Sequence, residues 1–518
     1  MARYKPYSYA QGKLIPIHFS RQILPGTFEY TLNHLIDHEL DLSLFDDRFR
    51  NDDTGATAYD PRILLKIVLF AYSRGIVSSR KIEQACRENV VFMALSADTR
   101  PHFTTIAAFV SSLDREIVHL FRDVLLVCDE MGLIGKEMFA IDGCKLPSNA
   151  GKEWSGTRAD FERKAGKLEK VIGQMLNRHR DQDRAQTDQD IKAREEQYVA
   201  TLQKRVRKIR EWLMHHDDKP GKTGKPKKSN ITDNDSAKMK TSHGVIQGYD
   251  GVTTVDGKHQ VIVHAAAFGE AQEHDLLQPM VEGTRENFQA ISRDKTEDVF
   301  GMAKLAADSG FHSEANMKML ATAGINAYVA DNRFRKRDPR FVDADRYRER
   351  HRLERAKLTG RRGLFSSADF SFPADLSHCI CPAGKRLYRS GHNVEVRGFV
   401  ATKFKGSKTN CLPCQLRSQC LRHPERTEIR QVAYFHGRSA QGRDTFTERM
   451  KRKIDSKIGR SLYSLRVAIA EPPFAHICHM MGLDRFTLRG RKKVNTQWNL
   501  FCIVHNLQKV SRYGPGFA

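Results

Sequence analysis

Apolar residues at helical spacing dominate residues 1–133. The run 60–75 is apolar apart from Lys66 and its ends, and Asp60 stands before a proline, which is a helix-start signal. A second helix is expected over 78–89, and the longer periodic run 104–133 predicts one helix or two. Two short helices with a tight turn are typical of helix-turn-helix DNA-binding units, and also of ordinary helix packing.

A short strand pattern follows this helical region. Phe139, Ala140 and Ile141 are predicted to form a buried strand, Asp142 to stand at its end, and Gly143 to let the backbone turn sharply. An aspartate in that place is either a turn former or the first ligand of a metal site.

Residues 152–240 have a different pattern, which predicts an inserted helical hairpin followed by a basic linker at 217–230. Two apolar stripes at steps of three or four define the two helices. They consist of Phe161, Leu168, Val171, Ile172, Met175 and Leu176, and of Tyr198, Leu202, Val206, Ile209 and Leu213.

Strand and helix patterns alternate from residue 243 onwards, which predicts a mixed α/β core. The pattern gives paired strands over 243–270, helices over 275–291 and 313–324, a small apolar run 301–311 that contains Asp308, and a strand over 325–330. An arginine-rich run covers 331–365, and helical patterns return at 459–483 and 496–513.

The charge of the chain changes this picture by suggesting a partner. The 518 residues include 86 Lys and Arg against 62 Asp and Glu, a formal charge of +24. So large a positive charge attracts polyanions, and nucleic acid is the commonest one for a soluble protein. The alternative is a ribosome-associated or merely basic protein. The most apolar stretch, 63–73, is short and contains Lys66, so we expect no membrane span, no signal peptide and a reducing cytoplasmic location.

Two acids stand out in the strand patterns, Asp142 and Asp308. Two carboxylates on neighbouring strand ends repel each other unless a cation lies between them, and Mg²⁺ or Mn²⁺ suits such oxygen ligands. A third acid is expected from a helix near the C-terminus, and Glu471 is the best candidate. On the same predicted helix, Arg466 could clamp a phosphate, with Tyr463 one turn away.

A family resemblance rests on these motifs together. The segments AIDGCKLPSNA, LAADSGFHSE, YSLRVAIAEPPF and GLDRFTLRGRKKVNTQWNLFCIVHNLQK resemble DDE transposases of bacterial insertion sequences. The branch with a Tyr-Arg-Glu-Lys signature and a Cys-rich insertion is the most similar. The helical segment YDPRILLKIVLFAYSRGIVSSRKIEQACREN looks like the N-terminal domain of the same elements.

The resemblance implies an RNase H-like core that cuts double-stranded DNA at the element ends and joins the 3′-hydroxyls to target DNA. It makes Asp142, Asp308 and Glu471 the catalytic, Mg²⁺-binding acids. It also implies a homodimer and a nucleoid-associated place in a bacterial cytoplasm. In this family the signature residues contact DNA, and here Tyr463 and Arg466 match the first two.

The chain departs from the signature in two places. One more residue separates Arg466 from Glu471 than the strict form has, and Cys478 stands near the position of the lysine. Arg485 or Lys492 is expected to replace that lysine in binding the element ends. A non-catalytic, zinc-containing DNA-binding protein, such as a decayed or domesticated transposase, is the rival hypothesis. A nuclease without strand transfer would share the same acids.

Five cysteines lie between 379 and 420, and a Cys-x-x-Cys pair at this density favours zinc over free thiols. The expected ligands are Cys381, Cys411, Cys414 and Cys420, with Cys379 or His423 as a spare.

The predicted fold class is therefore α/β: an RNase H-like mixed sheet core with a helical N-terminal domain, a helical-hairpin insertion and a small zinc-binding insertion. The expected domains are a DNA-binding region 1–133, a catalytic core 134–151 and 241–335, the hairpin and linker 152–240, the Arg-rich and Cys-rich insertion 336–435, and a C-terminal helical part 436–518.

Overall fold

The computed structural model falls into two compact units, each described by itself. Unit 1 comprises residues 1–331 and 456–518, and unit 2 comprises residues 332–455. The structure describes residues 16–517 except 49–56, 183–188, 222–223, 225, 242–243, 293, 295–297, 342–363, 397–398 and 437–444. Unit 2 is thus inserted between two segments of unit 1. No helix in the described ranges is long and apolar enough to cross a membrane.

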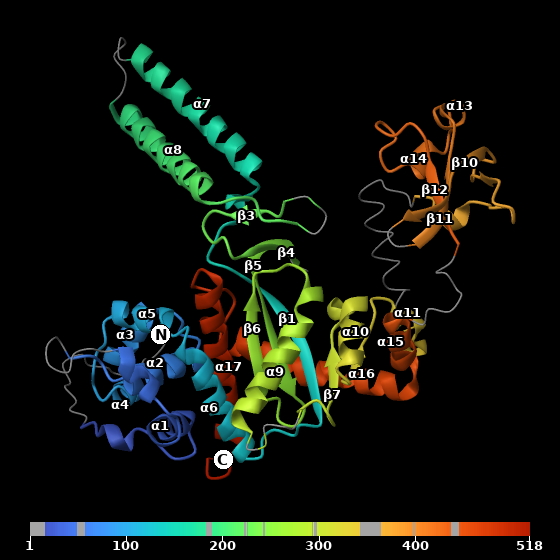
Figure 1. The fold of residues 1–518 in the computed structure, drawn as a ribbon. Coiled ribbons are helices and arrows are strands. Elements are labelled where there is room, and N and C mark those ends of the chain that lie inside the picture. Colours follow the sequence, from blue (N-terminus) through green and yellow to red (C-terminus); the bar gives the residue numbers. More distant parts are fainter. Residues whose placement is uncertain are drawn as a thin grey trace, which may run out of the picture. The chain divides into compact units, whose positions relative to one another are not determined.

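The N-terminal part of unit 1 is helical, as the sequence predicts (Figure 1). Its helices are α1 (Phe28–His38), α2 (Pro61–Ser73), α3 (Ser79–Glu88), α4 (Val90–Leu95), α5 (Phe103–Ser111) and α6 (Glu116–Glu130). The Asp60 side chain caps α2 by accepting a hydrogen bond from the Arg62 N–H at 2.8 Å. The run 104–133 forms two helices, α5 and α6, with a break between Ser111 and Glu116.

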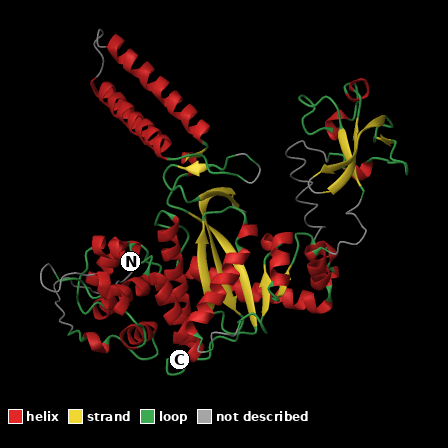
Figure 2. Cartoon of the chain, in the orientation of Figure 1, coloured by secondary structure: helices red, strands yellow, loops and turns green. Residues whose placement is uncertain are grey.

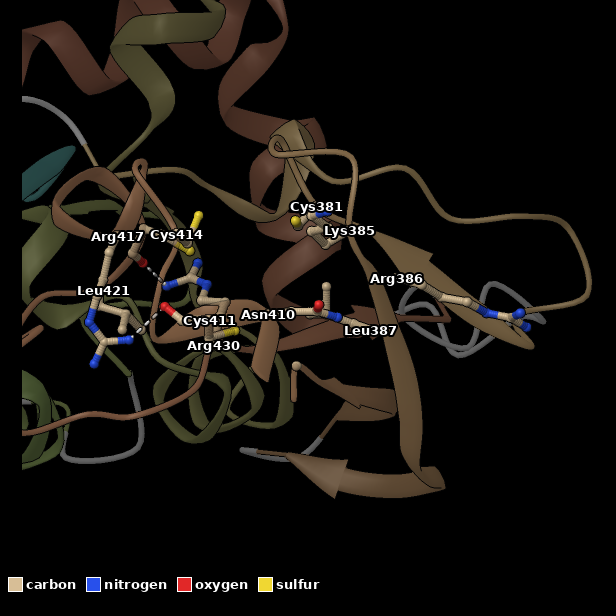
Figure 3. Close-up of a pocket in the computed structure, with 12 residues that line it drawn as sticks. Cys381, Lys385, Arg386, Leu387, Asn410, Cys411, Cys414, Arg417, Leu421 and Arg430 are labelled. Atoms are coloured by element: carbon tan, nitrogen blue, oxygen red, sulfur yellow. Dashed lines mark hydrogen bonds between the residues drawn. The ribbon is translucent and has the colours of Figure 1, made fainter. Parts of the chain in front are cut away.

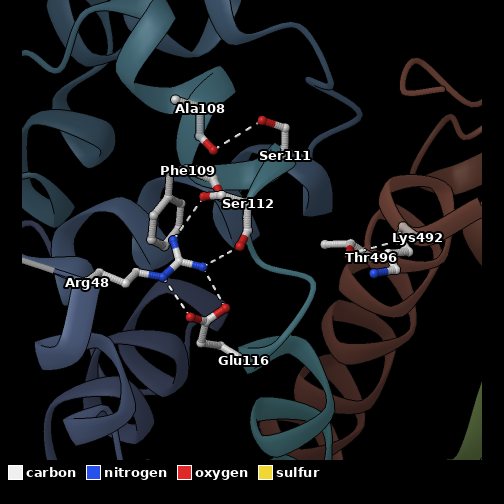
Figure 4. A network of polar contacts seen from close by, with 8 residues as sticks. All are labelled: Arg48, Ala108, Phe109, Ser111, Ser112, Glu116, Lys492 and Thr496. Carbon is white, nitrogen blue, oxygen red and sulfur yellow. Dashed lines mark hydrogen bonds and ion pairs between the residues drawn. The ribbon is translucent and has the colours of Figure 1, made fainter. Parts of the chain in front are cut away.

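Arg48, in the segment before α2, forms hydrogen bonds with the connection between α5 and α6 and with the start of α6 (Figure 4). Its guanidinium donates to both carboxylate oxygens of Glu116, at 2.7 and 2.5 Å, and to the hydroxyl and carbonyl oxygens of Ser112. Burial would raise the pKa of Glu116, but the hydrogen bonds that it accepts and the nearby charges of Arg48 and Arg115 together outweigh burial and lower that pKa. This carboxylate therefore has an arginine of its own.

A six-stranded mixed sheet forms the centre of unit 1 (Figures 1 and 2). Its strands are β1 (Met138–Pro147), β4 (Ala237–Thr241), β5 (Gly244–Asp256), β6 (Ile262–Phe268), β7 (Lys304–Ala307) and β8 (Asn326–Val329). The long strand β5 pairs antiparallel with β1 on one side, and with β4 and then β6 on the other. Strands β1, β7 and β8 run parallel. The predicted mixed α/β core is confirmed.

The strand β1 does not end at Asp142, so that prediction is wrong. The strand continues to Pro147, and Asp142 pairs with Thr253 of β5. What ends near Asp142 is the pairing with β7, whose last matched residues are Ile141 and Ala307. Beyond this point β1 has an open edge, since β5 supplies hydrogen bonds on one side alone.

Helices cover both faces of the sheet. On one face Thr284 of α9 (Leu277–Ile291) donates to Thr254 of β5 at 3.0 Å. On the other face Trp498 of α17 (Arg491–Tyr513) lies against Gly251, which leaves no room for a side chain there. Helix α16 (Lys457–Ala475) crosses β1, β5, β7 and β8. The α10 helix (Glu314–Thr322) begins at the Ser313 cap as predicted.

The predicted hairpin insertion consists of α7 (Arg158–Gln182) and α8 (Gln189–His215). Phe161, Ile209 and Trp212 form a small core, and Ile172, Val199 and Leu202 form a second. The predicted stripes are partly wrong, because Val171, Leu176 and Tyr198 are exposed. A two-helix arm buries one narrow seam, so residues at the edge of each stripe face solvent. Short strands β2 (Ser155–Gly156) and β3 (Ser229–Asn230) pair at its base.

Unit 2 is built on a four-stranded antiparallel sheet, β9 (His378–Ile380), β10 (Arg386–Val396), β11 (Phe399–Lys405) and β12 (Gln431–Phe435). Short helices α13 (Lys408–Cys411) and α14 (Arg417–Cys420) follow β11, while α11 (Phe334–Arg337) and α15 (Phe446–Asp455) lie at its two ends in sequence. Its core contains Phe370, Cys379, Leu387, Phe404 and Val432. Most of the predicted arginine-rich run 331–365 lies outside the described residues.

Candidate functional site

The two aspartates singled out in the sequence lie side by side in unit 1. Asp142 follows the last β1 residue paired with β7, and Asp308 follows the last residue of β7. Because β1 and β7 are parallel neighbours, both carboxylates emerge at the same edge of the sheet. We call these residues, with the groups described below that surround them, the carboxylate centre.

Arg466 of α16 bridges the two aspartates. Its Nη1 donates to Asp142 Oδ2, and its Nη2 lies 3.3 Å from Asp308 Oδ1. The guanidinium also lies 5.7 Å from the centroid of the Tyr463 ring. Arg466 and Tyr463 are both buried. The sequence therefore identified four residues that the fold brings together.

The balance of charges around Asp142 and Asp308 is unlike that around Glu116. The pKa of Asp142 is raised to about 6, chiefly by burial, with Arg466 opposing the rise and the Asp308 and Glu273 carboxylates adding to it. One arginine is shared between two acids, so it does not neutralise both. The centre has an unmet demand for positive charge.

Glu471 is not brought into the carboxylate centre. Five residues after Arg466, it is turned by about 140° around the helix and displaced by about 7.5 Å along it. Its side chain is exposed, whereas Arg466 is buried. Ile469 already lies beside Gly257, whose N–H bonds to Met138 at the start of β1. Helix α16 therefore leads Glu471 away from the end of β1 that holds Asp142.

Arg485 and Lys492 are exposed at the connection between α16 and α17 and at the start of α17. This connection is tied to the end of β1: Phe486 N–H donates to the Pro147 carbonyl at 2.9 Å, and Asn149 Nδ2 donates to the Thr487 carbonyl at 2.9 Å. Two exposed basic residues thus lie in a stretch of chain that is tied to the strand carrying Asp142.

Three further charged residues, which the sequence did not single out, lie at the same place. Lys145 of β1 pairs with Glu273, with 2.5 Å between Nζ and Oε1. Glu273 belongs to the turn η4 (Glu273–Asp275) before α9. Asp250 of β5 stands opposite Lys145 in the register. The available signal was the charged Asp250 inside an otherwise buried strand pattern.

Asp250 is a buried acid without a hydrogen bond. It is fully buried, and neither carboxylate oxygen has a hydrogen-bond partner among the described residues. Its pKa is raised to about 7, chiefly by burial, with Glu273 and Asp142 adding to the rise and Lys145 opposing it. A Cβ at Gly143 would lie 2.8 Å from Asp250 Oδ1, so the glycine makes room for this carboxylate next to Asp142.

Four cysteines of unit 2 line one small cavity (Figure 3). They are Cys381, Cys411, Cys414 and Cys420, the four expected zinc ligands. Cys379 is instead part of the unit 2 core. Burial raises the pKa of Cys420, with Arg430 opposing it and the other three thiols adding to it. We call these four residues the cysteine cluster.

The carboxylate centre and the cysteine cluster both contain groups that suit metal ions. Asp142 and Asp308 offer hard oxygen ligands that share a single guanidinium, which fits a divalent cation. Four thiols around one cavity fit Zn²⁺. As the side chains stand, no group of three or more His, Cys, Asp or Glu among the described residues is arranged to hold a metal ion.

Two stretches of the chain match models of known transposase domains. Residues 18–112 match a transposase domain of the DUF772 family, and residues 380–511 match a transposase DDE domain. The resemblance to DDE transposases of insertion sequences is thereby confirmed. The second match includes the cysteine cluster, Arg466 and Glu471, while Asp142 and Asp308 lie outside both matches.

The matches support transposase function, imply DNA as a partner and suggest a DNA-cleaving enzyme. A DDE domain also implies an RNase H-like fold, which agrees with the mixed sheet. No curated protein and no solved structure matches the chain.

Proposed function

We propose that this protein cuts DNA at the ends of an insertion sequence and joins the freed 3′-hydroxyls to target DNA by metal-dependent phosphoryl transfer. The observation that carries this proposal is the pair of aspartates at the ends of the β1–β7 pairing, bridged by a buried arginine. Such a pair, in a chain that matches transposase domains, favours a cation-dependent enzyme over a passive binding protein.

Asp142 and Asp308 would hold Mg²⁺ or Mn²⁺, with Glu471 as the third acid that the family resemblance assigns. A bound divalent cation supplies the charge that activates the attacking oxygen and stabilises the leaving oxygen. Arg466 contributes a planar cation beside both acids. When it releases a carboxylate, its guanidinium can donate two hydrogen bonds to a phosphate of the scissile strand.

Tyr463 supports this role by keeping Arg466 in place. The tyrosine ring contacts the guanidinium and is itself buried, so the arginine cannot swing freely into solvent. Arg485 and Lys492, both exposed, are the proposed contacts to the phosphates of element-end DNA. A homodimer acting on two ends is part of the same proposal.

The cysteine cluster would hold a structural Zn²⁺ that stabilises unit 2. The support is that the cavity has four cysteines in its lining, whereas Cys379 packs in the core. Four thiolates close the tetrahedral shell of zinc and leave no position for a substrate. The role is therefore structural.

A second candidate function is a non-catalytic, zinc-containing DNA-binding protein. The exposed position of Glu471, outside the carboxylate centre, favours it. Both candidates bind DNA, with an affinity that falls steeply with salt. Only the transposase requires the aspartates and a divalent cation for strand cleavage.

The test is cleavage of a DNA fragment that contains the ends of the element carrying this gene. The full-length protein is incubated with Mg²⁺, with Mn²⁺ and with EDTA, beside Asp142→Asn and Asp308→Asn. We expect nicking at the ends with either metal, and a loss of at least about 10³-fold in each variant, because each removes a charge that the cation requires. DNA binding without cleavage in all three proteins would instead support the binding-protein function.

A further inference from the structure

We propose that Glu273 is a further ligand of the divalent cation in the carboxylate centre. This inference rests on the proposed function, because it names a residue of the same site. Glu273 comes from the turn η4 on the α9 side of the sheet, whereas Asp142 and Asp308 come from strand ends. The cation would then be held by carboxylates from three separate segments.

The first argument is the contact between η4 and the turn after Asp308. Asp308 Oδ2 accepts a hydrogen bond from the Gly310 N–H at 3.4 Å. The Glu273 carboxylate lies against the same Gly310, so closely that a Cβ there would collide with Oε2. Asn316 fixes the two turns together, since its Nδ2 donates to the carbonyls of His274 and Phe311, each at 2.8 Å. Glu273 and Asp308 therefore both contact Gly310, in the three-residue turn Ser309–Phe311.

The second argument is the pairing of Glu273 with Lys145. Lys145 is three residues after Asp142 on β1, at the open edge beyond β7. Its ammonium pairs with Glu273, as the guanidinium of Arg466 pairs with Asp142 and Asp308. Three acids of the centre thus contact a cation supplied by the chain. Binding of a divalent cation would free Lys145 as well as Arg466 to contact phosphate oxygens.

The third argument is the buried acid beside this pair. Asp250 is fully buried with both carboxylate oxygens lacking a hydrogen-bond partner in the described ranges, and it stands opposite Lys145 in the register. Its Oδ1 is directed at the space above Gly143, next to Asp142. An unpartnered buried carboxylate is costly unless a cation or a proton donor satisfies it. Asp250 thus adds a buried, unpaired carboxylate beside Lys145 and Asp142, which strengthens the demand of the centre for a cation.

Glu273 also resolves a geometric difficulty with Glu471. Helix α16 carries Glu471 away from Asp142 and leaves it exposed, while Glu273 already lies at the Asp308 turn. A ligand from η4 comes from a turn that Asn316 already ties to the turn after Asp308. Bringing in Glu471 would require α16 to turn, and that would remove Arg466 and Tyr463 from their buried places.

The test is Mn²⁺ binding to the full-length protein, measured from the free Mn²⁺ signal in electron paramagnetic resonance. Wild type is compared with Asp142→Asn, Glu273→Gln and Glu471→Gln. Glu270→Gln is the matched control, because Glu270 is exposed and three residues earlier in the same segment. We expect Glu273→Gln to weaken binding about 10-fold or more, as losing a ligand does, and Glu270→Gln to leave it unchanged. Glu273→Asp, which keeps the charge and withdraws the carboxylate, replaces Glu273→Gln if that variant fails to fold.

The outcomes separate the inference from the proposed function. Wild-type Mn²⁺ binding in Glu273→Gln, together with loss in Asp142→Asn, overturns the inference and leaves the proposed function standing. Unchanged binding in Asp142→Asn overturns the proposed function. Lys145→Met gives a second measure: it should tighten Mn²⁺ binding in wild type but not in Glu273→Gln, because Lys145 competes through Glu273. Equal tightening in both backgrounds would mean a general charge effect and would count against the inference.

Discussion

The carboxylate centre of unit 1 draws its acids from four segments that lie far apart in the sequence, whereas the cysteine cluster of unit 2 draws its thiols from residues 381–420. In the centre, Arg466 and Lys145 contact three of the four acids. In the cluster, the thiols surround a cavity.

Under the proposed function, this difference corresponds to two different uses of a cation. Three of the four acids of the centre already have partners supplied by the chain, so a metal ion must compete with them and can leave again. That suits a cation that takes part in a reaction and in substrate binding. In the cluster, the four thiols would form the complete set of ligands around a zinc ion, which suits a permanent structural ion.

The largest expected effect tests whether the cysteine cluster holds a structural zinc ion. Cys411→Ser and Cys414→Ser should each abolish zinc binding and unfold the region around the cluster, because structural zinc contributes about 10–16 kcal/mol of apparent binding free energy in zinc-finger peptides. Atomic emission gives the zinc content, and limited proteolysis reports on folding. Cys379→Ala is the control, since this core cysteine should not affect the zinc content. A wild-type protein purified without zinc would contradict the comparison.

A smaller effect tests the assembly of the carboxylate centre. Gly310→Ala should lower the free energy of unfolding by about 1–3 kcal/mol, because the added methyl group collides with the Glu273 carboxylate. Combining it with Glu273→Ala should restore most of the loss, which a denaturant double-mutant cycle measures. Gly166→Ala is the control, because an added methyl group there meets open space. Additive effects of the two substitutions would show that Glu273 and Gly310 are not in contact.

The smallest expected effect concerns Glu116, an acid that has an arginine of its own, in contrast with the two aspartates of the carboxylate centre, which share one. Arg48 lowers the pKa of Glu116 below its ordinary value of 4.5. The pair therefore adds stability above that value, about 1 kcal/mol, and the contribution is lost as pH falls through the lower, folded-state pKa. The difference in unfolding free energy between wild type and Arg48→Met should shrink from neutral pH to about pH 3. A difference independent of pH would mean that Arg48 acts through packing.

The sequence predicted what local patterns determine. Asp60 caps the helix that its place before a proline suggested, a helix begins within the predicted range 313–324, and Asp308 directly follows β7. The Cys-x-x-Cys spacing likewise identified cysteines that line one cavity. Each of these features depends on residues within one or two turns of chain.

What the sequence could not give depends on contacts between distant segments. Asp142 looked like a strand end because its neighbours allow a turn, but pairing with β5 extends the strand through it. Glu273 resembles any surface acid until the Asn316 hydrogen bonds bring its turn to Asp308. The face that Glu471 occupies follows from the packing of α16, which the position of Arg466 determines.

The helix α17 has a consequence for how the chain folds as it is made. Among the strands that the structure describes, β6 pairs with β5 alone, and its outer edge is satisfied by α17: Asn506 exchanges two hydrogen bonds with the Ile262 backbone, and Asn495 accepts one from the Ala267 N–H. The ribosome synthesises α17 after the whole of unit 2, so a nascent chain carries β6 with an uncovered edge. Such edges pair with other chains. Slow or interrupted translation should therefore favour aggregation of the unfinished protein.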